Sequence, residues 1–147
     1  MRLSVIGCGY LGAVHAACMA DLGHEVVGVD VDAAKVDLLA AGTPPFHEPG
    51  FADLLERALA TGRLTFTTDP DAVASAQVHF VCVGTPQRED SYAADLRYVD
   101  DAVDALVARL APHPDGPVVV VGKSTVPVGT AERIAAQIAR AAPDAGA

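Results

Sequence analysis

Hydrophobic residues follow two patterns that alternate along the chain. Short, β-branched runs predict buried strands at residues 2–6, 25–30, 64–67, 78–83 and 118–121. Longer stretches with apolar positions three and four residues apart predict helices at 11–22, 35–41, 51–60, 95–110 and 130–142. Strands therefore alternate with helices, which is the order typical of an α/β fold with a parallel sheet.

The residues that flank the predicted helices support this interpretation. A glycine follows each of the first two helices, where glycine commonly ends a helix. Asp32 is placed to cap the second helix, and Asp69 before Pro70 predicts a further short helix. Residues 43–50 hold three prolines, so we expect an ordered connection without regular structure there.

This order of elements predicts a Rossmann-type, doubly wound parallel sheet. With 147 residues the chain has the size of one domain, and 51% of its residues are hydrophobic, which suits a buried sheet covered by helices. We therefore predict a single dinucleotide-binding domain over residues 1–147. The turn-like residues 143–147 would lead into a sixth strand, so we expect that strand and all later domains to be absent from these residues.

The composition argues against several classes of partner. The formal net charge is -9 and the ten Lys and Arg residues are scattered, so the basic cluster that binds nucleic acid is missing. Glycines interrupt the apolar residues after Arg2, and no apolar stretch is long enough to span a membrane. The three cysteines have no spacing typical of disulfides or zinc sites, which favours a reducing, cytoplasmic location.

Gly7, Gly9 and Gly12 form the pattern GxGxxG between the first predicted strand and the first predicted helix. In that context the pattern indicates dinucleotide binding. Gly7 permits a tight turn, Gly9 lets the backbone approach a pyrophosphate, and Gly12 allows close packing of helix on strand. Tyr10, within the same turn, is a further candidate contact. A glycine turn that binds no ligand is the alternative.

Asp30 ends the second strand, where a carboxylate accepts hydrogen bonds from an adenosine ribose. A carboxylate there also repels a 2′-phosphate, so we predict NAD rather than NADP. A purely capping role for Asp30 is the alternative, although Asp32 is better placed for it. Lys35, one turn into the next helix, either reaches the ribose or is a solvated helix residue.

Two polar loops follow the fourth and fifth predicted strands, at the edge of the sheet where open α/β sheets bind ligands. The first contains Thr85 before Pro86, and the second contains Thr125 within KSTVPVGT at 123–130. Hydroxyl groups at these places predict contacts with ribose or nicotinamide. The alternative is that Thr before Pro serves only as turn chemistry.

The histidines and cysteines give weaker signals. His47 lies beside Glu48, but no third residue at a suitable spacing completes a metal site. Cys8, Cys18 and Cys82 lie in apolar stretches, where a thiol usually packs as a small hydrophobic group rather than acting as a nucleophile. We therefore expect no metal and no catalytic residue in this chain.

Five motifs, in order, resemble those of the N-terminal domain of the UDP-glucose and GDP-mannose dehydrogenase family, the nucleotide-sugar 6-dehydrogenases. They are VIGCGYLGAVHA at 5–16, HEVVGVDVDAAK at 24–35, HEPGFADLL at 47–55, FVCVGTP at 80–86 and KSTVPVGT at 123–130. The resemblance covers essentially the whole chain. The last motif is more similar to UDP-glucose dehydrogenases than to GDP-mannose dehydrogenases.

The resemblance implies both cofactor contacts and an activity. Leu11, Asp30, Lys35, Thr85 and Thr125 occupy the positions of NAD contacts in the family. Members oxidise a sugar C6 alcohol to an acid in two hydride transfers to NAD, through an intermediate bound to a cysteine. The family's catalytic Cys, Lys, Asn, Asp and Glu lie downstream of these residues. We therefore expect the chain to bind NAD without turning over UDP-glucose.

The resemblance also limits the partners. A UDP-sugar would bind only with the family's C-terminal domain, and full-length members are expected to form homo-oligomers. Fold alone leaves other functions open. A regulatory module that senses NAD or NADH, as in potassium-channel regulatory domains, would use the same strand–helix–strand unit without chemistry. A methyltransferase domain would bind a methyl-donor nucleoside, but the five motifs disfavour it.

Overall fold

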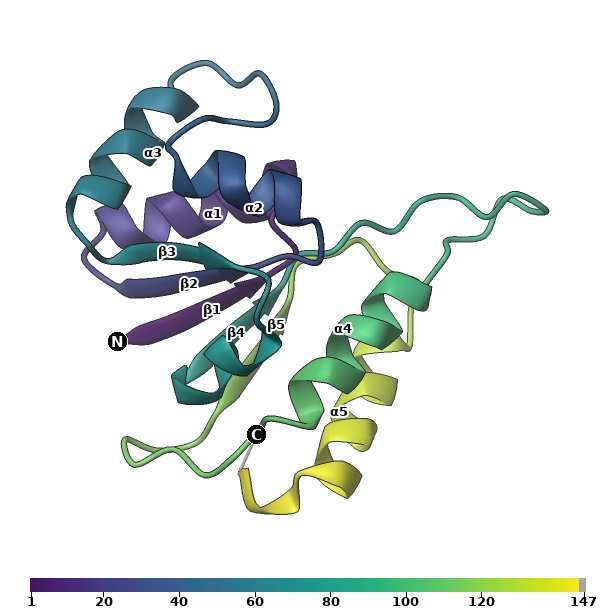
Figure 1. Cartoon of the computed structure of the whole chain (residues 1–147). Helices are drawn as coiled ribbons and strands as arrows, with labels where there is room; N and C mark the ends of the chain where they lie inside the picture. The colour runs from purple at the N-terminus through teal and green to yellow at the C-terminus, as the bar shows by residue number, and fades with distance from the viewer. Residues whose placement is uncertain (146–147) are drawn as a thin grey trace.

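The computed structural model describes residues 1–145, and its fold is the predicted α/β architecture (Figure 1). Within these residues five strands form one parallel sheet in the order β3-β2-β1-β4-β5. The strands are β1 (Arg2–Ile6), β2 (Glu25–Val29), β3 (Leu64–Thr67), β4 (Val78–Val81) and β5 (Val119–Gly122). The chain runs outward from β1 to β3 and then crosses back to β4, so the order reverses beside β1. This reversal confirms the doubly wound sheet.

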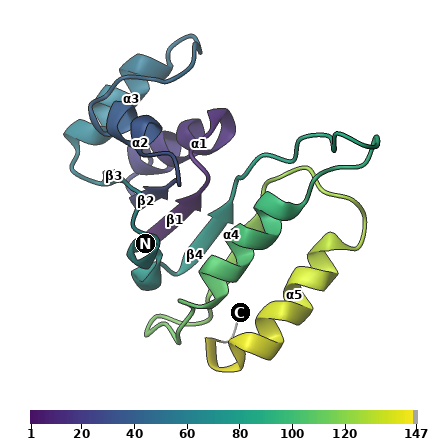
Figure 2. The same ribbon diagram turned by 45° about the vertical axis from the view of Figure 1, so that its right-hand side comes forward.

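Helices cover both faces of the sheet (Figures 1 and 2). One face carries α1 (Tyr10–Asp21), α2 (Ala33–Ala40) and α3 (Phe51–Ala60). The other carries the short 3-10 helix η1 (Pro70–Ser75), α4 (Arg97–Val107) and α5 (Thr130–Ala141), and a last 3-10 turn, η2, spans Pro143–Ala145. None of the helices in residues 1–145 is long and apolar enough to cross a membrane.

Each face of the sheet has its own hydrophobic core. Successive side chains of a strand point to opposite faces, so Val26 packs in the core beneath α1, while Val27 and Val29 pack with Leu106 of α4. Gly28 lies between them, and a Cβ there would come within 2.5 Å of the Phe66 ring. The absence of a side chain at Gly28 therefore leaves room for the Phe66 ring of the neighbouring strand β3 in the first core.

Element boundaries differ slightly from the sequence-based expectation, and the hydrogen bonds give the reasons. α4 begins at Arg97 rather than at 95, because the Asp95 carboxylate accepts the Arg97 backbone N–H at 3.1 Å and so sits before the helix. β4 ends at Val81 rather than at 83, because Val81 is the last residue of β4 paired with both β1 and β5. The connection 43–50 has no regular structure, as predicted.

Candidate functional site

A cleft of about 780 Å³ opens at the carboxyl ends of the central strands. This is the edge at which open α/β sheets bind ligands, beside the point where the strand order reverses. Four of the residues singled out in the sequence line the cleft together, namely Gly7, Gly9, Asp30 and Lys35. The structure thus brings the glycine turn and the acidic end of β2 into one site.

Close packing determines the shape of the glycine turn. Gly7 has a φ of +90°, and a Cβ there would lie 2.9 Å from the Val83 backbone nitrogen. A Cβ on Gly12 would lie 1.9 Å from the carbonyl oxygen of Gly7, so α1 starts directly against the turn. Gly9 is different, since a Cβ there would meet nothing within 4 Å. Gly9 therefore borders open space in the cleft, as the approach of a pyrophosphate requires.

The start of α1 supplies hydrogen-bond donors beside that open space. The helix begins at Tyr10, and the first N–H that bonds back along the chain is that of Ala13, to the Gly9 oxygen at 2.9 Å. The earlier N–H groups, at Tyr10, Leu11 and Gly12, have no acceptor within the helix. Together with the helix dipole, these backbone groups attract a phosphate.

Asp30 is only 7% exposed and is held at the end of β2 by hydrogen bonds. The Cys8 backbone N–H donates to its Oδ2 at 2.7 Å, and the Asp32 backbone N–H donates to its Oδ1 at 3.0 Å. Asp30 does not cap α2, because the Asp32 carboxylate accepts the Lys35 backbone N–H at 3.2 Å and is the N-cap. The Asp30 carboxylate is thus fixed at the wall of the cleft, and its contact with a ribose stays a prediction.

Lys35 turns its side chain back toward this carboxylate. Its Nζ donates to Asp30 Oδ1 at 3.0 Å and to Oδ2 at 2.9 Å, although the residue belongs to the helix that follows. The two options left open by the sequence are a ribose contact and a solvated helix residue. Lys35 lies in the wall of the cleft and is paired with Asp30 rather than extended into solvent, and its contact with a ribose stays a prediction.

The loops after β4 and β5 lie side by side. Thr85 Oγ1 donates to the carbonyl oxygen of Thr125 at 2.8 Å, and Ser124 Oγ donates to the carbonyl oxygen of Val83 at 2.7 Å. Gly84 and Pro86, on either side of Thr85, line the cleft, whereas Thr85 and Thr125 do not. The two threonines stand at its margin, so their contact with a cofactor stays a prediction.

One contact that the sequence analysis missed ties α1 to the connection 43–50. The Tyr10 hydroxyl donates a hydrogen bond to the Glu48 carboxylate, which raises the pKa of Tyr10. The Tyr10 ring also packs against Phe46, which stacks on Phe51 at the start of α3, with ring centroids 5.1 Å and 5.2 Å apart. Sequence periodicity carries no signal for partners this far apart in the chain.

The far wall of the cleft was also missed. Tyr98, Asp101 and Ala105 of α4 line it, although the sequence analysis gave α4 no role in binding. Cys82 lines the cleft as well, but only 7% of Cys82 is exposed and burial raises the pKa of its thiol to about 11. A thiol held neutral in this way is a poor nucleophile.

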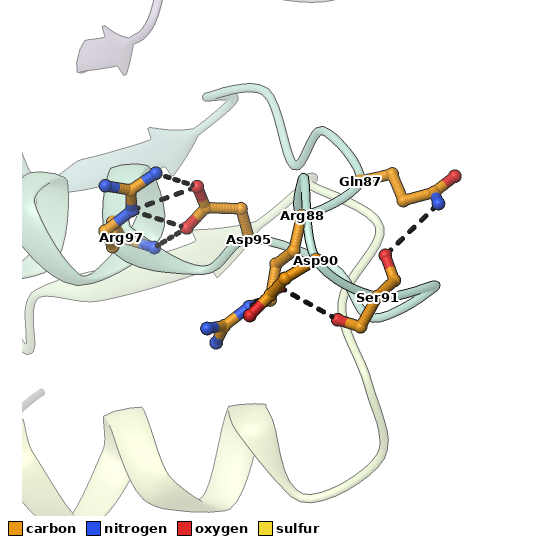
Figure 3. Close-up of polar contacts among 6 residues, drawn as sticks. All are labelled: Gln87, Arg88, Asp90, Ser91, Asp95 and Arg97. Atoms are coloured by element: carbon orange, nitrogen blue, oxygen red, sulfur yellow. Dashed lines mark hydrogen bonds and ion pairs between the residues drawn. The ribbon is translucent and has the colours of Figure 1, made fainter.

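The segment between β4 and α4 extends away from the sheet as a polar arm (Figure 1), and Figure 3 shows the polar contacts along it. The Gln87 amide donates to the Ser91 carbonyl oxygen at 3.1 Å, and Arg88 pairs with Asp90 at 3.2 Å. At its base Arg97 donates to both carboxylate oxygens of Asp95, and these hydrogen bonds hold the pKa of Asp95 at about 2. The ion pair fixes the start of α4, which carries the far wall of the cleft.

Two histidines, His79 and His15, pack against neighbouring side chains inside the fold. His79 of β4 is buried, its Nδ1 lies 2.7 Å from Ser4 Oγ, and burial lowers its pKa to about 4. His15 packs edge-on against Phe80, with centroids 4.4 Å apart. Among residues 1–145 no three His, Cys, Asp or Glu side chains are grouped so as to hold a metal ion, and Glu48 bonds to Tyr10.

Comparison with known proteins identifies the family of the chain. The sequence profile of the UDP-glucose/GDP-mannose dehydrogenase family, NAD binding domain, matches residues 1–147. The chain belongs to this family. As its NAD-binding domain, the chain has NAD as its cofactor, and the cleft offers open space at Gly9 and a buried carboxylate at Asp30.

Individual relatives agree with this assignment. The chain is 46% identical over 135 residues to UDP-glucose 6-dehydrogenase of Rhizobium meliloti, covering 91% of this chain and 30% of the relative. A UDP-glucose dehydrogenase structure from Pyrobaculum islandicum superimposes with a TM-score of 0.83 at 45% identity, covering 99% of this chain and 33% of that one. A ternary complex of GDP-mannose dehydrogenase from Pseudomonas aeruginosa gives 0.88 at 39% identity, with 97% and 33% covered. The chain thus spans about a third of these family members.

Proposed function

We propose that residues 1–147 form the cofactor-binding part of a UDP-glucose 6-dehydrogenase. The observation that carries the proposal is that Cys8, inside the glycine turn, donates its backbone N–H to Asp30, so that the phosphate and ribose sites belong to one cleft. NAD would be held by Gly7, Gly9, Tyr10, Leu11, Gly12, Asp30, Lys35, Thr85 and Thr125.

The proposed roles follow from the geometry of these residues. The backbone at Gly9 and the first turn of α1 binds the pyrophosphate, because those N–H groups are free and no Cβ blocks the approach. Asp30 and Lys35 bind the adenosine ribose. Thr85 and Thr125, joined at the ends of β4 and β5, hold the nicotinamide half. Bound NAD supplies the hydride acceptor for oxidation of a sugar alcohol.

We place the sugar site and the acid–base chemistry outside residues 1–147. The only thiol in the wall of the cleft within residues 1–145 is that of Cys82, whose pKa is raised by burial. The loop KSTVPVGT at 123–130 favours UDP-glucose as the substrate, because it resembles the corresponding loop of UDP-glucose dehydrogenases. The name of the Rhizobium meliloti relative agrees with this choice.

The test separates cofactor binding from turnover. The chain alone is mixed with NAD and UDP-glucose, NAD binding is followed by calorimetry, and NADH is followed by absorbance. We expect binding without NADH formation. A chimera in which the chain replaces the matching third of the Rhizobium meliloti enzyme should form NADH. Robust turnover by the chain alone would contradict our placing of the chemistry.

A second measurement, size-exclusion chromatography, distinguishes a dehydrogenase domain from a regulatory module. A sensor of NAD and NADH would change its shape or association with the redox state of the nucleotide, so size-exclusion profiles with NAD and with NADH would differ. A dehydrogenase domain should give the same profile with both. An inactive chimera together with a redox-dependent profile would favour the sensor.

A further inference from the structure

The cleft continues past the glycine turn and Asp30 along the edge of the sheet. In the strand order β3-β2-β1, the glycine turn follows β1, Asp30 follows β2 and Thr68 follows β3. The Asp30 backbone N–H donates to the carbonyl oxygen of Thr67 at 3.2 Å, so the ends of β2 and β3 are joined there, and Thr68 also lines the cleft. With the phosphate at Gly9 and the ribose at Asp30, as proposed, the base of the cofactor extends toward the end of β3.

This end of the cleft lies between α4 and η1, the short helix that follows β3. Its walls are mainly apolar, and the residues that these two elements contribute include Pro70, Val73, Ala102, Ala105 and Leu106. The Arg109 guanidinium links the two elements, because it donates to the Asp71 carboxylate and to the Ala105 carbonyl oxygen, both at 2.7 Å. An apolar compartment of this kind suits the rings of a base.

Asp101 brings a carboxylate to this compartment. α4 carries three aspartates, and two of them face α5. Asp100 accepts a hydrogen bond from Arg133 at 2.6 Å, and Asp104 accepts one from Gln137. Asp101 lines the cleft instead, and among residues 1–145 its carboxylate forms no ion pair. It can therefore accept hydrogen bonds from a ligand in the cleft.

Two exposed side chains border the same end of the cleft. Tyr98 lies three residues before Asp101, so both lie on one face of α4, and its ring is 52% exposed. Val31, directly after Asp30, is 99% exposed and also lines the cleft. An aromatic ring and an aliphatic side chain pack against the face of any base. Contacts of this kind do not distinguish one base from another, whereas a carboxylate does.

We propose that Asp101 is a specificity-determining residue of the cofactor site, whose carboxylate accepts a hydrogen bond from the exocyclic amino group of adenine. This inference rests on the proposed binding of NAD in the cleft. An ionised carboxylate has acceptors and no donor, so it favours a base that presents N–H groups. A base whose amino nitrogen carries no hydrogen gains nothing from Asp101.

The test compares NAD with etheno-NAD, an analogue whose amino nitrogen is tied into an extra ring and carries no hydrogen. The unchanged chain and Asp101→Leu are titrated with both nucleotides, and dissociation constants are measured by calorimetry at low ionic strength. Leu has nearly the shape of Asp but accepts no hydrogen bond, so a purely steric preference for NAD would persist in this variant. We expect the unchanged chain to prefer NAD, and this preference to fall at least about threefold in Asp101→Leu.

Two further variants separate this role from a general effect on the helix. Asp104→Leu makes the same substitution where α4 contacts α5, and the preference for NAD should stay that of the unchanged chain. Asp101→Asn keeps an acceptor oxygen, so it should retain more of the preference than Asp101→Leu does.

Three outcomes would overturn the inference. They are equal affinity of the unchanged chain for NAD and etheno-NAD, a preference that persists in Asp101→Leu, and an equal loss of preference in Asp104→Leu. Failure of the unchanged chain to bind either nucleotide would instead count against the proposed function.

Discussion

The hydroxyl of Tyr10 donates a hydrogen bond to the carboxylate of Glu48, joining the first residue of α1 to the connection between α2 and α3. Phe46 and Phe51 extend this contact into an aromatic row that ends at the start of α3. The helix whose N-terminus faces the proposed phosphate site is therefore anchored from outside the strand–helix–strand unit.

Tyr10→Phe tests whether this anchor acts on the cofactor. Loss of the hydroxyl should lower the free energy of unfolding by about 1 kcal/mol, the usual net value of one hydrogen bond. NAD affinity should change by less than about threefold, because the backbone N–H groups remain. Urea denaturation and calorimetry measure the two effects. Glu48→Gln, which keeps an acceptor, is the control and should cost less stability. A tenfold loss of NAD affinity in Tyr10→Phe would show that the side chain positions the phosphate site.

Gly9→Ala and Gly12→Ala separate space for the ligand from space for the fold. A Cβ on Gly9 meets nothing within 4 Å, so stability should stay within about 0.5 kcal/mol, whereas NAD binding should weaken at least about tenfold as the methyl group enters the phosphate path. A Cβ on Gly12 would lie 1.9 Å from the Gly7 oxygen, so that variant should lose at least about 2 kcal/mol of stability. Thermal melts and NAD titrations check both. Unchanged NAD affinity in a folded Gly9→Ala protein would contradict the proposed path of the pyrophosphate.

Buried His79 should make the protein less stable in mild acid. Its pKa is about 4 in the fold, against an ordinary value of 6.5, so the unfolded chain binds a proton in this range that the folded protein does not. The stabilisation is complete above the ordinary value and is lost as the pH falls from 6.5 toward 4, by at most about 3 kcal/mol. Urea denaturation between these pH values measures the slope. His79→Asn keeps a partner for Ser4 without titrating, so its slope should be shallower; identical slopes would contradict this cause.

The three cysteines should differ in reactivity toward a maleimide at neutral pH. Burial raises the pKa of Cys8 to about 12 and that of Cys82 to about 11, so both thiols should react slowly, while the half-buried Cys18 reacts first. Mass spectrometry of the labelled protein locates the modification. NAD should slow labelling of Cys82 further, because this residue lines the cleft, whereas Cys18 provides an internal control. Rapid labelling of Cys82 would contradict its burial and mean that the cleft is far more open in solution than in this structure.

Local patterns were enough to predict most of the fold. Strand 2–6, helix 51–60 and strand 64–67 were predicted with the bounds that the structure has, because each is a short apolar pattern between clear turn signals. The start of α4 was predicted less accurately, since Asp95 and Arg97 form an ion pair that the hydrophobic periodicity does not encode. Bounds of this kind depend on side-chain hydrogen bonds rather than on hydrophobic spacing.

Only those site residues that belong to a local sequence motif could be predicted. Gly7, Gly9, Asp30 and Lys35 were found from their spacing and do line one cleft. The contribution of Tyr98 and Asp101 was not, because it depends on how α4 packs across the sheet edge. The contact between Tyr10 and Glu48 likewise depends on a loop that folds back over α1.

The hydrogen bond from the Cys8 backbone to Asp30 fixes the distance between the glycine turn and the end of β2. A residue of the turn that we propose binds the phosphate thus holds the proposed ribose acceptor directly, so the two groups cannot move apart without breaking a buried hydrogen bond. We therefore expect the cleft to favour nucleotides whose distance from phosphate to ribose matches this fixed separation.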